Sequence, residues 1–335
     1  MKVKKRITNV IAALLVLSAS FFTGCGDKVP EYQLEIIPSF RLDVPDVDLD
    51  KYFTKVTDVS VTNDGGFIIV DIAGPGVLLF DNEGNYEKNL AGFGSGNYEA
   101  LCSAAQVDTM IAIHTLQLLE IVTENGKPVK RHFLRGRGDI AIAQDGRFLF
   151  NRMYDSRMFK ICLESYDENG AVINKFRTPR AQQEGEEILD FAFSRLTPDS
   201  KIVYVPTVTD SAFVYDFEGN LLVKKKLESK LKPYKMEEDA PGSLVEDVFV
   251  NEDGIYIIRV NKELTNEKIV YFDLIEQYDF DLNRIATYRI AKPLTMTVPV
   301  DIFSPWYHKF VVKDGVFYIM VSQPFEQLIA FQVKK

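Results

Sequence analysis

Short apolar runs, separated by turn residues, recur along most of the chain, and the clearest stretch is 56–90. Within it, 58–62 alternates polar residues with valine, the period of two that marks a half-buried strand. After an Asn-Asp-Gly-Gly turn, 67–70 is wholly apolar and rich in β-branched residues, which is typical of a buried strand. Two more strand-like runs, 77–80 and 86–90, each follow a turn that contains glycine. The stretch therefore predicts four short strands joined by three turns.

Weaker copies of this unit follow along the chain, at about 102–134, 139–176, 188–227, 245–290 and 309–333. The aspartates of their first turns lie about 40 to 60 residues apart, near the ~40–50 residue period of propeller repeats. They are Asp64, Asp108, Asp145, Asp199, Asp253 and Asp314. A four-stranded meander cannot bury both of its faces alone, so such units stack on one another in a ring. The fold class predicted is all-β, a six-bladed β-propeller of four-stranded antiparallel blades.

The sixth unit ends after its third strand, which would leave one edge of the ring exposed. The segment 31–40 is strand-like but has no partner nearby in the sequence, and it is similar to the fourth strands of earlier units. We therefore expect 31–40 to form the outermost strand of the last blade. This closure makes 31–335 a single propeller domain.

Residues 1–24 are interpreted as a targeting segment. A basic start is followed by an apolar run at 10–22, which is shorter than a membrane-spanning helix. The tetrapeptide 22–25 (FTGC) then resembles the lipobox of bacterial lipoproteins, although phenylalanine stands where leucine is usual. We predict a signal peptide over 1–24, a diacylated Cys25 that anchors the protein, and a lipidated tether over 25–30. The alternative is an ordinary secretory signal followed by a chance cysteine.

The net charge of the chain limits the kinds of partner that it can bind. Without 1–24, the chain keeps 35 basic residues against 48 acidic ones, a formal charge of −13. Such a protein is a poor fit for nucleic acid. Gly26 stands where an aspartate commonly retains lipoproteins in the inner membrane, so we expect the outer membrane. Cys102 and Cys162 lie in apolar strand contexts and are expected to be buried thiols, with a disulfide as the alternative.

The order of strands and turns resembles that of NHL-type propellers, and it looks closest to the six-bladed propeller lipoproteins of Bacteroidota. In those proteins a Gly-x-Gly-x-Gly-x-Tyr stretch follows the first blade, and 92–98 (GFGSGNY) resembles it, with Ser95 where proline often stands. The resemblance implies the fold and an envelope location. It implies no general activity.

One cluster, made mainly of arginines, is expected on the face of the propeller that carries the loops between the second and third strands of each blade. It contains Arg135, Arg137, Arg152, Tyr154 and Arg157, from two adjacent loops. Guanidinium groups bind carboxylates and phosphates through paired hydrogen bonds, so these residues could hold a carboxylate, a phosphate or an acidic glycan. The alternative is a solvated rim whose charges pair with nearby acids.

A second candidate is the run Trp306, Tyr307 and His308, which could stack on a sugar or an aromatic ligand. The alternative is that Trp306 packs under its own loop or plugs the channel. Asp71 and His114 could line the channel mouth, as acids and histidines do in six-bladed lactonases and lyases.

Catalytic and metal motifs are missing from the sequence. The chain has three histidines, and it contains no His-x-x-x-His, Cys-x-x-Cys, EF-hand loop or Gly-x-Ser-x-Gly pattern. We therefore expect a membrane-anchored, non-catalytic protein that binds a small molecule, a glycan or an envelope protein. The alternative is a propeller hydrolase or lyase with Ca²⁺ or Zn²⁺ in its channel. A weaker option is a structural module of a larger envelope complex.

Overall fold

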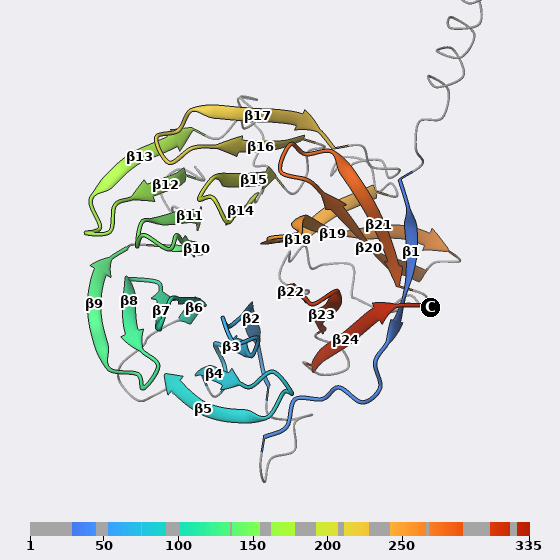
Figure 1. The fold of residues 1–335 in the computed structure, drawn as a ribbon, viewed down its shortest axis with the longest axis horizontal. Helices are drawn as coiled ribbons and strands as arrows, with labels where there is room; N and C mark the ends of the chain where they lie inside the picture. The colour runs from blue at the N-terminus through green and yellow to red at the C-terminus, as the bar shows by residue number, and fades with distance from the viewer. Residues whose placement is uncertain are drawn as a thin grey trace, which may run out of the picture.

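The computed structural model describes residues 29–44, 53–74, 76–91, 101–134, 136–154, 162–177, 192–206, 211–227, 242–265, 268–290, 309–321 and 327–335. Strands and turns make up these segments, which hold no helix that could cross a membrane. The strands are arranged as a ring of sheets around a central axis (Figure 1). The described part of the chain is thus all-β and propeller-like.

Four antiparallel sheets of four strands each follow one another in the described chain, and each pairs its strands in sequence order. The first contains β2 (Val56–Val61), β3 (Phe67–Asp71), β4 (Gly76–Phe80) and β5 (Tyr86–Ala91). The second contains β6 (Leu101–Val107), β7 (Met110–Thr115), β8 (Leu118–Thr123) and β9 (Pro128–Phe133). The third contains β10 (Arg137–Ile142), β11 (Phe148–Tyr154), β12 (Cys162–Tyr166) and β13 (Val172–Arg177). The fourth contains β14 (Ala192–Leu196), β15 (Ile202–Pro206), β16 (Ser211–Tyr215) and β17 (Leu221–Lys226).

The remaining strands form one eight-stranded sheet, in the order β18-β19-β20-β21-β1-β24-β23-β22. The first half comprises β18 (Gly242–Asn251), β19 (Gly254–Thr265), β20 (Lys268–Tyr278) and β21 (Arg284–Ile290). The second half comprises β1 (Glu31–Ile36), β24 (Gln327–Val333), β23 (Val316–Val321) and β22 (Lys309–Lys313). In Figure 1 the blue strand β1 lies between β21 and the red strand β24.

The prediction of six separate sheets therefore differs from the structure, because the last eight strands are continuous. The cause is β1, which finds a partner on each of its edges: it runs antiparallel to β24 and parallel to β21. Its pairing with β24 is the closure expected of 31–40, whereas its pairing with β21 was not foreseen. The strand is also shorter than predicted, since it ends at Ile36 and a turn over 37–40 follows.

The turns between third and fourth strands show why the repeat is visible in the sequence. In the turn after β16, Asp216 Oδ1 accepts the backbone N–H of Asn220 at 2.8 Å, and Oδ2 accepts its side-chain amide at 2.7 Å. Gly219 has a φ of 92°, which glycine adopts without strain. Leu282, at the same place after β20, has a φ of 62° and is buried. The same Oδ1 bond to the residue four positions on is made by Asp81, Asp167 and Asp279.

The hydrophobic core lies between neighbouring sheets, as β3 illustrates. Phe67 and Ile69 pack in a cluster with Val311 and other residues of β22–β24, whereas Ile68 and Val70 pack in a cluster with β6 and β7. The first sheet is thus covered by the second sheet on one face and by the last strands on the other, which closes the ring. Each such side chain, when fully buried, contributes about 1.5–3 kcal/mol to folding.

Candidate functional site at the ring axis

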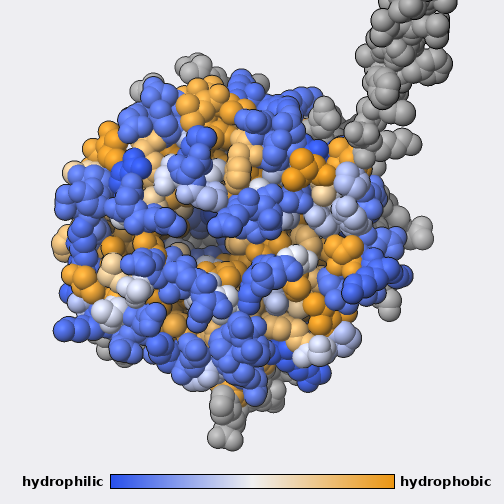
Figure 2. All heavy atoms as spheres, viewed as in Figure 1, coloured by the Kyte–Doolittle hydropathy of each residue, from blue (hydrophilic) through white to orange (hydrophobic). Residues whose placement is uncertain are grey.

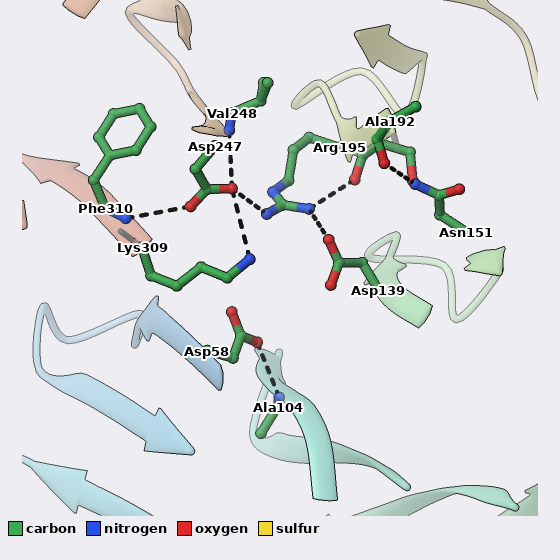
Figure 3. Close-up of polar contacts among 11 residues, drawn as sticks. Asp58, Ala104, Asp139, Asn151, Ala192, Arg195, Asp247, Val248, Lys309 and Phe310 are labelled. Atoms are coloured by element: carbon green, nitrogen blue, oxygen red, sulfur yellow. Dashed lines mark hydrogen bonds and ion pairs between the residues drawn. The ribbon is translucent and has the colours of Figure 1, made fainter. Parts of the chain in front are cut away.

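Five charged side chains meet near the axis of the ring, where the first strands of the sheets lie (Figures 1 and 3). We call these residues the axial ring, and they come from strands that are far apart in the sequence. They are Asp58 of β2, Asp139 of β10, Arg195 of β14, Asp247 of β18 and Lys309 of β22. The space-filling view shows the face hollowed near its centre and bordered largely by hydrophilic residues (Figure 2).

Asp247 is the residue that connects most of the ring. Its Oδ1 accepts hydrogen bonds from Arg195 Nη2 and from the backbone N–H of Val248, both at 2.9 Å. Its Oδ2 accepts the backbone N–H of Phe310 at 3.2 Å, and Lys309 Nζ lies 3.9 Å from Oδ1. The side chain is 3% exposed, so this carboxylate is buried together with its cationic partners. Buried ion pairs of this kind depend on having every partner in place.

Arg195 links two acids across the axis. Its Nη1 donates to Asp139 Oδ2 at 3.3 Å and to the backbone oxygen of Ser194 at 3.0 Å, while its Nη2 donates to Asp247. Burial opposes the charge on Arg195, but the surrounding carboxylates outweigh burial and raise the pKa of this guanidinium. Burial likewise works to raise the pKa of Asp139, but the charges of Lys309 and Arg195 hold that pKa below its ordinary value. Both groups are therefore ionised at neutral pH.

Asp58 differs from the other two acids because it forms no ion pair with any residue that the structure describes. Its Oδ2 accepts the backbone N–H of Ala104, in β6, at 3.2 Å. Burial raises the pKa of Asp58 to about 6, an effect that Lys309 and Arg195 partly oppose. With three carboxyl groups and two cations, the axial ring carries one excess negative charge when Asp58 is ionised.

Lys309 is buried with its hydrogen-bonding capacity unused. The side chain is 4% exposed, and within the described residues its ammonium group makes no hydrogen bond, only the ion pair with Asp247 at 3.9 Å. Burial works to lower the pKa of Lys309, but Asp247 and Asp139 raise it above the ordinary value, so the group stays charged. In Figure 3 the side chain runs toward the gap between Asp247 and Asp58. Three N–H donors thus lie at the axis without a hydrogen-bond acceptor in the described chain.

Neutral hydrogen bonds join neighbouring sheets around the same axis. Ser60 Oγ, in β2, donates to the backbone oxygen of Ala104 in β6 at 2.9 Å. Asn151 Nδ2, in β11, donates to the backbone oxygen of Ala192 in β14 at 2.6 Å. Together with the bond from Ala104 N–H to Asp58, they tie strands that share no sheet. Part of the role of these polar residues is therefore to hold the ring together.

A second buried ionic cluster lies within the eight-stranded sheet and is a poor candidate for a site. Arg259 Nε donates to Glu276 Oε2 at 2.7 Å, and Arg284 Nη1 donates to Glu276 Oε1 at 3.1 Å. The side chains of Arg259 and Glu276 are 2% and 0% exposed. Tyr278 donates its hydroxyl to the same carboxylate at 3.0 Å. Because Arg259 and Glu276 are almost wholly buried, this cluster joins β19, β20 and β21 and presents little surface to a ligand.

The backbone brings three of the predicted rim residues together. In the pairing of β10 with β11, Arg137 lies opposite Tyr154 and Gly138 lies opposite Arg152, with a register shift between the two pairs. These three residues therefore share one end of the third sheet, but they lie in strands β10 and β11 and not in the loops that the sequence predicted. The other predicted ligand residues, Arg135, Arg157, Trp306, Tyr307 and His308, lie outside the described residues.

Asp71 does not stand at an open channel mouth. It is fully buried, and its carboxylate accepts the backbone N–H groups of Thr54 at 2.7 Å, Lys55 at 3.0 Å and Ala73 at 3.1 Å. A Cβ added to Gly74 would lie 2.4 Å from Asp71 Oδ2, so the loop is folded tightly over this group. The carboxylate is used to hold two chain segments against the end of β3.

His114 is likewise buried, with 1% of its surface exposed. Its ring packs edge-on against Phe150, with 5.1 Å between the ring centroids, and neither ring nitrogen has a hydrogen-bond partner among the described residues. Burial lowers the pKa of His114 to about 4, so the imidazole is neutral. It does not face an open mouth. Cys102 is buried as expected, whereas the side chain of Cys162 lies outside the described residues.

Sequence reasoning missed the axial ring, although a signal for part of it exists. A charged residue interrupts each of several first strands that otherwise alternate apolar and small polar residues. Three of the ring acids stand at one fixed offset, six residues before the aspartate of a first turn. These pairs are Asp58 with Asp64, Asp139 with Asp145, and Asp247 with Asp253. A constant offset inside a repeat predicts that the residues lie at the same distance from the axis of the ring.

The axial ring does not suit the metal expected of a hydrolase or lyase. Among the residues that the structure describes, no three His, Cys, Asp or Glu side chains gather closely enough to hold a metal ion. The ring offers three carboxylates, but Arg195 and Lys309 lie among them with permanent charges. A Ca²⁺ or Zn²⁺ ion there would meet both cations, and carboxylates held by arginine have fewer lone pairs to offer.

Comparison with known proteins supports the fold. No protein-family model and no curated protein sequence matches the chain. Among solved structures, a DUF4221 family member from Bacteroides vulgatus matches with a TM-score of 0.59 at 13% identity, over 90% of this chain and 99% of that one. The calcium-binding protein regucalcin from Agrobacterium tumefaciens matches with a TM-score of 0.54 at 11% identity, over 91% and 96%. A streptogramin B lyase matches with a TM-score of 0.51 at 11% identity, over 90% and 97%. At such identities the likeness shows a β-propeller fold and nothing about activity.

Proposed function

We propose that the protein is a lipid-anchored, non-catalytic β-propeller of the cell envelope that binds a small molecule, a glycan or another envelope protein. The observation that carries this proposal is the composition of the axial ring. Its acids are arranged around Arg195 and Lys309, which balance two of the three carboxylate charges, so the chain itself compensates most of the charge at the axis. A centre that is already compensated favours holding a ligand over activating a metal-bound water.

We also propose that the ring consists of six blades, similar to the NHL-like blades found in Bacteroidota lipoproteins. The eight-stranded sheet then consists of two blades, β18–β21 and β22–β24 with β1, joined where β1 meets β21. The antiparallel pairing of β1 with β24 supports this count, because it gives the last three strands a fourth.

The anchor is proposed from the sequence. Cys25 follows a basic and apolar leader and precedes β1 by six residues, so an acylated Cys25 would hold the ring close to the membrane. Five intervening residues can span at most about 18 Å. Labelling with palmitate, followed by the Cys25→Ser variant as control, tests this part. We expect label in the wild type at the outer membrane and none in the variant.

We further propose that the arginines at the end of β10 and β11 bind an anionic group, a carboxylate, a phosphate or an acidic glycan, with Trp306 as an additional stacking surface. The register that sets Gly138 opposite Arg152 and Arg137 opposite Tyr154 supports this proposal, since it gathers two guanidinium-bearing residues on one sheet end.

Thermal unfolding of the full-length protein in detergent tests the binding function. Glucuronate and inorganic phosphate serve as anionic probes, and Ca²⁺, Zn²⁺ and a chelator serve as metal probes. We expect an anion to raise the melting temperature of the wild type. Arg152→Gln should lose that shift, whereas Arg147→Gln, which removes an arginine paired with Asp145, should keep it. Metal-dependent stabilisation together with hydrolysis or lyase turnover would overturn the proposal.

A further inference from the structure

The axis of the ring holds one donor and one acceptor that have no hydrogen-bond partner in the described chain, the Lys309 ammonium and Asp58 Oδ1. Lys309 is 96% buried at its side chain and makes no hydrogen bond within the described chain. Asp58 uses Oδ2 to accept the N–H of Ala104, and its Oδ1 has no partner among the described residues. Neither Lys309 Nζ nor Asp58 Oδ1 is among the fully buried side-chain atoms that lack a partner, so both atoms open toward the axis, where a ligand could bond to them.

The position of these groups makes them accessible from the axis. Asp58 is only partly buried, and the Arg195 side chain beside it is 20% exposed. In Figure 3 the ammonium of Lys309 is directed into the gap between Asp247 and Asp58, and Figure 2 shows the molecule hollowed near its centre.

The charges around the gap limit which chemical group can enter it. A cation would have Lys309 and Arg195 among its neighbours, and an anion would have three carboxyl groups, so either ion would lose its water beside like charges. A hydroxyl group escapes both penalties, because it can accept a hydrogen bond from the ammonium and donate one to the carboxylate. Sugars carry several hydroxyl groups on one rigid frame, so neighbouring hydroxyls could also reach Arg195.

We propose that the ring axis is a binding site for a neutral sugar, one of whose hydroxyl groups is held between the Lys309 ammonium and the Asp58 carboxylate. The proposal rests on the binding function proposed above and names one of its ligands. It concerns side chains other than the arginines at the end of β10 and β11, which would take an acidic group. Water is the competing occupant, since it also donates and accepts.

Saturation-transfer NMR and calorimetry on the full-length protein in detergent test the site. The probes are glucose, galactose and N-acetylglucosamine, with acetate and methylammonium as charged probes. We expect at least one neutral sugar to bind saturably and both charged probes to fail. Asp58→Asn and Lys309→Met should each weaken sugar binding at least tenfold. Asp199→Asn and Lys201→Met remove an exposed acid–lysine pair of 2.7 Å and should leave it unchanged.

A pH series on the wild type keeps the test independent of whether the variants fold. Burial raises the pKa of Asp58 to about 6, and the charged groups that face it are Lys309, Asp139, Arg195 and Asp247. The pKa of Asp139 is held below its ordinary value and those of Lys309 and Arg195 above theirs, so these three groups keep their charges near pH 6. Sugar affinity should therefore fall severalfold as the pH drops from 7.5 to 5, when the carboxylate acceptor is neutralised. Affinity that is flat across this range would overturn the proposal, as would the absence of sugar binding or binding that both axial variants retain. If the sugars fail but glucuronate or phosphate still binds, the axial site is wrong and the binding function stands.

Discussion

Two sets of aspartates recur around this molecule and use their carboxylates in opposite ways. The turn aspartates, such as Asp81, are half-buried in turns at the surface, and hydrogen bonds from Asn85 lower the pKa of that carboxyl. Of the ring acids, Asp139 and Asp247 are buried and pair with Arg195 and Lys309 from distant strands, whereas Asp58 is partly buried and accepts the N–H of Ala104. The first set shapes local backbone, whereas the second joins strands more than forty residues apart. Aspartate side chains thus cap local turns at the edge of the ring and connect distant strands at its axis.

Replacing the most connected ring acid should have the largest effect. Asp247→Asn leaves Arg195 and Lys309 buried without their shared carboxylate, which typically costs about 3–5 kcal/mol of the free energy of unfolding. Urea denaturation followed by tyrosine and tryptophan fluorescence measures it. The matched control, Asp199→Asn, removes an exposed ion pair and should cost less than about 1 kcal/mol. A loss below about 1 kcal/mol for Asp247→Asn would mean that the ring contributes little to stability.

Replacing Asp58 should have the opposite effect on stability, because the pKa of Asp58 in the folded state, about 6, lies above the ordinary value of 3.8. The folded protein holds this proton more tightly than the unfolded chain, so the stability due to Asp58 is present below pH 4 and is lost as the pH rises to 6. A shift of that size corresponds to about 3 kcal/mol at most. Asp58→Asn should therefore stabilise the protein, by about 1 kcal/mol more at pH 8 than at pH 5. Equal effects at the two pH values would contradict this assignment.

A turn aspartate should give the smallest of these changes. Asp216→Ala removes the two hydrogen bonds that its carboxylate accepts from Asn220. Because the turn is exposed and water can replace those bonds, we expect a loss of about 0.5–1.5 kcal/mol that does not vary between pH 6 and 8. Thermal unfolding at both pH values measures it. A loss as large as that of Asp247→Asn would remove the distinction between edge and axis.

The elements that the sequence predicts well are those with local causes. The four strands of the first sheet follow from period-two alternation and Gly-containing turns, and β2–β5 lie where the pattern of 56–90 places them. Even the eroded turn of the second unit forms, because Asp108 adopts a φ of 54° that aspartate tolerates better than most residues. Local signals of this kind survive in a single sequence because each turn needs only a few neighbouring residues.

The features that escaped prediction depend on contacts between distant segments. The fusion of the last eight strands requires β1 to meet β21, and no pattern within 31–40 reveals a second partner. The axial ring requires Asp58, Arg195 and Lys309 to converge, which happens only once the sheets have stacked. Asp71 and His114 have the chemistry of site residues, but their burial is set by the loop at Thr54 and by Phe150, which the sequence pattern does not place beside them.

A double-mutant cycle between Asp247 and Arg195 tests most directly whether charge at the axis is balanced by the chain itself. The free energies of unfolding of the wild type, Asp247→Asn, Arg195→Met and the double variant give the coupling between the two side chains. Because they bond at 2.9 Å in a buried setting, we predict a favourable coupling of about 1–3 kcal/mol. Additive losses, with a coupling below about 0.3 kcal/mol, would contradict a compensated axis and with it the basis for proposing a non-catalytic binding protein.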